Sequence, residues 1–242
     1  MPVYTVYTLP ESEITVSGGG QLSGITQGDG SHLVGLDITL NSNNWITVDV
    51  DDNDTNFADN DSSQTLDSAI TYDGESYGAG TRVEAEFRFT VQDPGGNNYE
   101  LIAFNLVEGG GVPYGTIEGL AFVGTFPPQG VPLTVLSAAE GPRNSGGSST
   151  TFGGYATPPC FAAGCKIKTA SGARKVEDLV PGELVMTLDH GLQQIRWVGR
   201  RHITGSMLAV APHLRPIRVK AHALGRNDPH RDTLLSPQHR VL

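Results

Sequence analysis

The sequence predicts an all-β protein: an antiparallel β-sandwich-like domain over residues 1–137, followed by a smaller β-rich unit over residues 160–242. Short runs of β-branched and aromatic residues alternate with Gly, Asn and Asp, and little repeats at helical spacing. The charge also reverses, because residues 1–159 contain 20 acidic and 3 basic side chains, whereas residues 160–242 contain 6 and 13. Such a reversal at one point of the chain indicates two units with different surfaces.

The clearest strand pattern in the first part covers residues 82–91. Charged and apolar side chains alternate there, as expected for a strand with one face in water. The Pro-Gly-Gly-Asn-Asn sequence at 94–98 is typical of a turn in an antiparallel meander or sandwich. Further strands are expected at residues 14–16, 32–40, 45–50 and 99–106.

Residues 138–159 are predicted to be a flexible linker. Gly and Ser are so frequent there that the segment buries too little apolar surface to offset its backbone entropy. After it, Pro181-Gly182 should end a short helical turn that begins at Lys175. The strands expected in the second unit lie at residues 165–169, 184–188, 194–198 and 217–219.

The composition of the chain indicates which binding partners and which cellular compartment to expect. No run approaches the ~18 apolar residues that a membrane span requires. The N-terminus lacks the basic and apolar regions of a cleavable secretory signal, so we expect the chain to reach an extracellular or cell-surface location by a non-classical export route. No nucleic-acid partner is expected, because no aromatic stacking stripe accompanies the basic residues Arg196, Arg200, Arg201, Arg215 and Arg218.

An acidic run at residues 49–61 offers the oxygen ligands that Ca²⁺ prefers. It is not an EF-hand, since Asp54 stands where that loop needs Gly and Asn60 where it needs Glu. A solvated acidic loop is the favoured interpretation and a weak calcium site the alternative; no other cofactor is expected. The candidate ligands are Asp49, Asp51, Asn53, Asp59 and Asp61.

Several motifs in the second unit occur in a recognisable order. It begins with Cys160-Phe-Ala-Ala-Gly-Cys-Lys-Ile-Lys-Thr, continues through Val176-Glu-Asp-Leu and Pro181-Gly-Glu-Leu-Val, and reaches Ser236-Pro-Gln-His239. This order and spacing resemble the Hint (hedgehog/intein-type) domains of bacteria, particularly of alphaproteobacteria. Residues 1–159 resemble the acidic region that often precedes such domains. The resemblance implies a partial Hint β-fold, an incomplete horseshoe, from Cys160 onward.

The resemblance also implies autocatalytic processing of the chain. The Cys160 thiol would attack the Pro159 carbonyl and convert the peptide bond into a thioester, an N-to-S acyl shift. His239 takes the general-acid role, and Ser236 stands where the family often has Thr. Water or another acceptor nucleophile would then release or receive residues 1–159, so the chain's own first domain is the substrate. The alternative is a non-catalytic secreted β protein that binds calcium or a surface partner and carries an inactive Hint remnant.

Two departures from the family bear on this expectation. The chain ends at Leu242, shortly after His239, whereas a complete Hint fold continues and splicing members end in His-Asn. We therefore expect a domain truncated within the Hint fold and inactive by itself. Cys165 stands where the family commonly has Thr or a small residue, and a disulfide with Cys160 would block the nucleophile.

Overall fold

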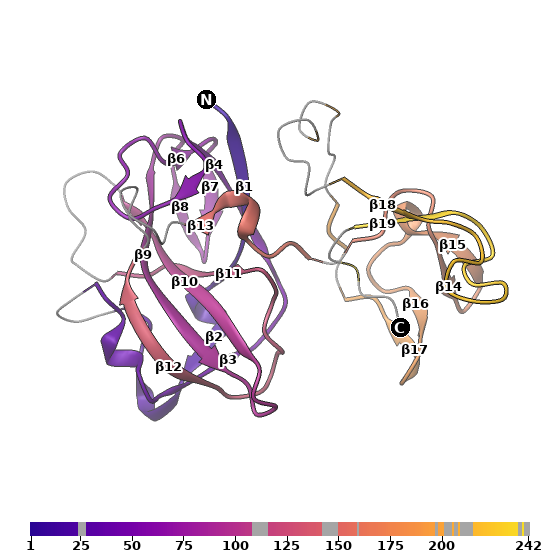
Figure 1. Cartoon of the computed structure of the whole chain (residues 1–242), viewed down its shortest axis with the longest axis horizontal. Helices are drawn as coiled ribbons and strands as arrows, with labels where there is room; N and C mark the ends of the chain where they lie inside the picture. The colour runs from indigo at the N-terminus through magenta and orange to yellow at the C-terminus, as the bar shows by residue number, and fades with distance from the viewer. Residues whose placement is uncertain are drawn as a thin grey trace. The chain divides into compact units, whose positions relative to one another are not determined.

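The computed structural model describes residues 1–23, 28–107, 116–141, 150–158, 160–196, 198–200, 205, 208, 215–236 and 239. The chain divides into two compact units, Met1–Thr157 and Pro158–Leu242 (Figure 1). Both are built from β-strands and short 3₁₀ turns, which confirms the predicted all-β class. Within the described residues, no helix has the length and apolar character needed to cross a membrane.

A nine-stranded antiparallel sheet forms the frame of the first unit. Its strands follow the order β10-β11-β1-β4-β6-β9-β12-β3-β2, and β10 also pairs with β9. The first six strands of this order, which begin with β10 and end with β9, therefore close into a barrel. The remaining strands, β12, β3 and β2, extend the sheet beyond β9 (Figure 1). The bounds are β1 Val3–Pro10, β2 Ile14–Val16, β3 Asp37–Leu40, β4 Ile46–Asp51, β6 Thr65–Leu66, β9 Arg82–Gln92, β10 Asn98–Val107, β11 Gly119–Val123 and β12 Leu133–Glu140.

A bulge in β9 changes the face on which the side chains of this strand are buried. Ala85 and Phe87 lie in different hydrophobic clusters, although side chains two apart in a regular strand share a face. The pairing of β9 with β10 shifts register between Ala103 and Asn105, which places an extra residue in β9. The strand thus changes the face that its odd-numbered side chains occupy, and it contributes to two cores.

The remaining elements of the first unit are short. The paired strands are β5 Asn56–Phe57 with β13 Thr150–Thr151, and β7 Ile70–Tyr72 with β8 Glu75–Tyr77; the 3₁₀ turns are Glu11–Glu13, Ser17–Gly19, Ser31–Leu33 and Phe152–Gly154. The strand expected at 32–40 is reduced to β3. The turn at Ser31–Leu33 precedes it, and Gly35, at φ +84°, interrupts the extended backbone.

The predicted linker at 138–159 is wrong at both ends. β12 continues to Glu140, which pairs with Phe87 of β9. Gly141 follows so closely that a Cβ there would lie 1.8 Å from the Ala85 carbonyl oxygen. After residues 142–149, which lie outside the described residues, Phe152 is buried in the core of the first unit.

Aromatic packing explains why residues after the Gly-Ser tract are ordered. The Phe152 ring stacks on Tyr4 with centroids 4.3 Å apart, and it packs on Phe57 at 5.6 Å. Tyr155 meets Phe57 edge-on at 5.5 Å. Burial of these rings offsets the entropy lost when the segment is ordered.

The second unit contains a four-stranded sheet in the order β15-β14-β16-β17 and a separate pair, β18 with β19. The strand expected at 194–198 lies earlier, as β17, because a hairpin joins Thr187 to Gly191 and sets its register. The run expected to begin as a helical turn contains a 3₁₀ turn at Val176–Asp178. The bounds are β14 Lys166–Thr169, β15 Gly172–Lys175, β16 Leu184–Thr187, β17 Gly191–Gln194, β18 Ile217–Val219 and β19 Thr233–Leu235.

Replacement of Phe152 by Ala should destabilise the first unit by about 3 kcal/mol, because it removes a buried ring from the core. Urea unfolding followed by Trp45 fluorescence measures this effect, in a Trp197→Phe background that removes the other tryptophan. Thr151→Ala, at the exposed neighbouring position, should change stability by less than ~0.5 kcal/mol. If Phe152→Ala unfolds at the same urea concentration as its parent, the segment does not belong to the core.

Candidate functional site

The start of the second unit lies against its last described strand. The backbone that follows Cys160 runs antiparallel to β19, and Phe161 forms a β-bridge with Leu235. The Ser236 N–H donates a hydrogen bond to the Cys160 carbonyl at 3.1 Å. Sequence positions at the two ends of the predicted domain are thereby adjacent in space.

Cys160 is exposed, and its amide N–H and its thiol each have a defined partner. Its amide N–H donates to Ser236 Oγ over a long 3.4 Å, so the nitrogen that would leave in an acyl shift faces the serine hydroxyl. Its Sγ donates to the Pro158 carbonyl at 2.9 Å, and the thiol must leave that contact before it attacks a neighbouring carbonyl. Pro159, the other residue of the predicted cleavage site, lies outside the described residues.

His239 belongs to the same group. Its N–H donates to the Ser236 carbonyl at 3.0 Å, and its ring lies 4.4 Å from the Phe161 ring, centroid to centroid. Ser236 therefore contacts the Cys160 amide through its side chain and the His239 amide through its main chain. All three predicted catalytic residues are brought together.

The environment of His239 favours a neutral imidazole. Partial burial lowers the pKa of the ring, because desolvation disfavours its charged form. Nδ1 is buried and has no hydrogen-bond partner among the described residues. A neutral ring with an uncommitted nitrogen is chemically suited to accept a proton and pass it on.

Cys165 occupies a different environment from Cys160. It is buried, and its thiol donates to the Leu234 carbonyl on β19 at 3.2 Å. No disulfide joins the two cysteines. The geometry thus gives Cys165 a packing role beside β19, the strand that directly precedes Ser236.

The candidate calcium ligands predicted on β4 are separated by existing contacts. Asp49 accepts a hydrogen bond from the Thr5 hydroxyl. Asp51 pairs with the terminal ammonium of Met1 at 3.2 Å. Asn53 is exposed. None of these three belongs to the carboxylate cluster that the structure forms nearby.

That cluster consists of Asp52, Asp54 and Asp61, so only Asp61 was among the predicted ligands. Asp59 is buried and accepts from the Asn60 amide at 2.8 Å. The sequence did show a dense acidic run, but not where the chain turns after β4, and the turn decides which carboxylates converge.

One comparison with known protein families finds a similarity, and it falls on the second unit. Residues 159–242 match the family model for the Hint domain. No curated protein and no solved structure matches the chain.

The pKa of His239 should lie below its ordinary value of 6.5. A histidine Hε1 titration by NMR measures it, with the resonance assigned by its loss in His239→Gln. Because the unfolded chain takes up this proton first, the second unit should lose stability as the pH falls from 6.5 through the lowered pKa. A midpoint at or above 6.5 would contradict the desolvated environment described here.

Proposed function

On the premise that residues 159–242 are a Hint domain, we propose that this chain cleaves itself at the Pro159–Cys160 bond and releases or transfers residues 1–159. The observation that carries the proposal is the arrangement around Ser236. Its hydroxyl accepts from the amide of the nucleophile, and its carbonyl holds the backbone of the histidine. A nucleophile, a leaving nitrogen and a proton carrier thus belong to one site.

The first step is an isomerisation that gains and loses no atoms. The Cys160 thiol gives its proton to neutral His239, and the sulfur bonds to the carbonyl carbon of Pro159. The bond from that carbon to the Cys160 nitrogen then breaks, and the nitrogen takes the proton from the imidazolium. The lowered pKa of His239 supports this order, because the resting ring is available as an acceptor.

Ser236 acts as a positioning residue in this scheme. Its hydroxyl orients the Cys160 amide. Its main-chain carbonyl accepts a hydrogen bond from the His239 N–H and so positions the backbone of the histidine. The family's Thr has the same hydroxyl, so the substitution keeps the group on which the geometry depends.

The second step resolves the thioester. Water adds to the thioester carbon, the thiol of Cys160 leaves, and residues 1–159 depart with a new carboxylate. A stronger nucleophile would take the place of water and remain attached to Pro159. The substrate is the chain's own first unit, and the acceptor is water or such a nucleophile.

The test uses the complete gene product that contains residues 1–242, followed by intact-mass measurement. Hydroxylamine should accelerate release of residues 1–159, because it intercepts a thioester faster than water does. Cys160→Ala should abolish release, and His239→Ala should slow it by ~10²–10⁴-fold, the usual loss of a general acid.

Cys165→Ala is the matched control, because it removes the chain's other thiol from outside the proposed reaction path. It should release residues 1–159 at a rate close to that of the parent. Continued release at Pro159–Cys160 in Cys160→Ala would rule out the mechanism.

Substitutions of Ser236 test its positioning role separately. Ser236→Ala should slow release by roughly tenfold, the effect of one lost hydrogen bond, whereas Ser236→Thr should retain the rate. Single-turnover kinetics of the two variants provide the measurement. Equal rates for Ala and Thr would show that the hydroxyl has no part in the reaction.

A further inference from the structure

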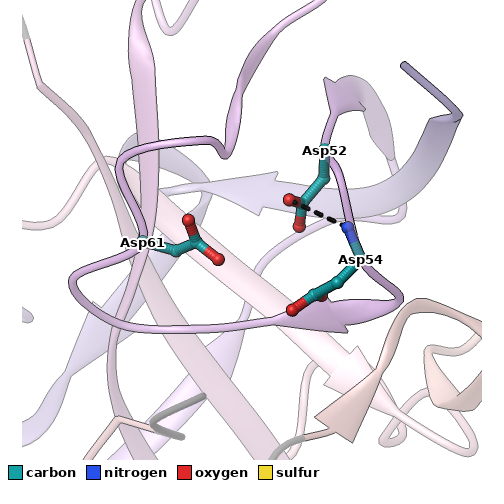
Figure 2. Close-up of side chains that lie close together, drawn as sticks. All are labelled: Asp52, Asp54 and Asp61. Carbon is teal, nitrogen blue, oxygen red and sulfur yellow. Dashed lines mark hydrogen bonds between the residues drawn. The ribbon is translucent and has the colours of Figure 1, made fainter.

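Three aspartates of the first unit converge in the loops that follow β4. One carboxylate oxygen from each of Asp52, Asp54 and Asp61 lies within 4.8 Å of the other two. Figure 2 shows the three carboxylates turned toward a common point. This spacing allows a single cation to contact all three.

Asp52 provides a second observation that points to a ligand. Its side chain is fully buried at 0% exposure. Oδ1 accepts from the Asn53 N–H at 2.6 Å and from the Ser63 hydroxyl at 3.0 Å, whereas Oδ2 is buried and has no hydrogen-bond partner in the part of the chain that the structure describes. A buried carboxylate oxygen in this state is costly unless a proton or a cation satisfies it.

The other two carboxylates are held by their own turns. Asp54 Oδ1 accepts from the Asn56 N–H at 2.6 Å, and Asp61 Oδ1 accepts from the Ser63 N–H at 2.8 Å. These bonds fix the side chains before any ion arrives, which reduces the ordering that binding would require.

The local charge favours a divalent ion. Within the described residues, neither Asp52 nor Asp54 forms an ion pair. Asp52 is buried, and the carboxylates of Asp54 and Asp61 lie close to it, so three like charges gather with little water between them. A cation among the three carboxylates would compensate the buried charge of Asp52 and reduce its repulsion with the other two.

We propose that Asp52, Asp54 and Asp61 bind a Ca²⁺ ion. Carboxylate oxygens suit this hard cation, and its flexible coordination accepts an irregular set of loop ligands completed by water. Mg²⁺ fits less well because it demands near-ideal octahedral geometry. The ion would also stabilise β5, which begins two residues after Asp54 and pairs with β13.

The experiment uses the full chain and Ca²⁺ alone, with chelator-treated protein as the reference. Isothermal titration calorimetry should show saturable binding, and the thermal midpoint reported by Trp45 should rise by roughly 5 °C at saturation, since the ion binds only the folded state. Trp197→Phe again isolates the signal from the first unit. Absence of binding up to about 10 mM Ca²⁺, beyond the range of weak extracellular sites, would overturn the proposal.

Variants assign the binding to this site. Asp52→Asn keeps the side-chain shape and should weaken binding at least tenfold. Asp54→Asn, at a half-buried position, should also weaken Ca²⁺ binding at least tenfold. This variant tests the site if Asp52→Asn fails to fold. Glu75→Gln removes an equal charge from exposed β8 and should bind like the parent. Parent-like affinity in either Asp variant would overturn the site, and an equal midpoint shift with Mg²⁺ would overturn the choice of ion.

Discussion

The hydrogen bonds between Cys160 and Ser236 are the constraint on which the proposed chemistry depends. They join residues 76 positions apart and place the Cys160 amide against a hydroxyl. Without this antiparallel contact, the cysteine would be an exposed thiol after a Gly-rich tract, with no proton carrier near it. The same contact brings Phe161 against the His239 ring, so one piece of backbone pairing organises both the nucleophile and the acid–base group.

The site also shows how stability and reactivity oppose each other. Among the described residues, no group forms a hydrogen bond with the buried Nδ1 of His239, which destabilises the fold, and burial of the ring lowers its pKa. Structural histidines usually avoid this state, whereas a proton carrier benefits from it. The first unit shows the same opposition. The carboxylates of Asp52, Asp54 and Asp61 lie so close together that their repulsion destabilises the fold, and a bound cation would remove that repulsion.

The sequence allowed prediction of features that short stretches encode. The alternation at 82–91 identified β9, and the resemblance of the Cys160 and Ser236 motifs to Hint domains identified the residues that meet in the site. Features that depend on distant partners could not be predicted. These include closure of the barrel through β9 and β10, burial of Phe152 after a Gly-Ser tract, and the convergence of Asp52 with Asp61. Each depends on where a turn or bulge directs the chain, which composition does not specify.

The central claim is that a thioester forms between Pro159 and Cys160. Free cysteine tests this most directly, because it exchanges with a thioester through its thiol and then rearranges to a stable amide. The complete gene product, incubated with cysteine and examined by mass spectrometry, should release residues 1–159 with one cysteine joined to Pro159. Release of residues 1–159 as the carboxylic acid alone, at the same rate with and without cysteine, would contradict the thioester.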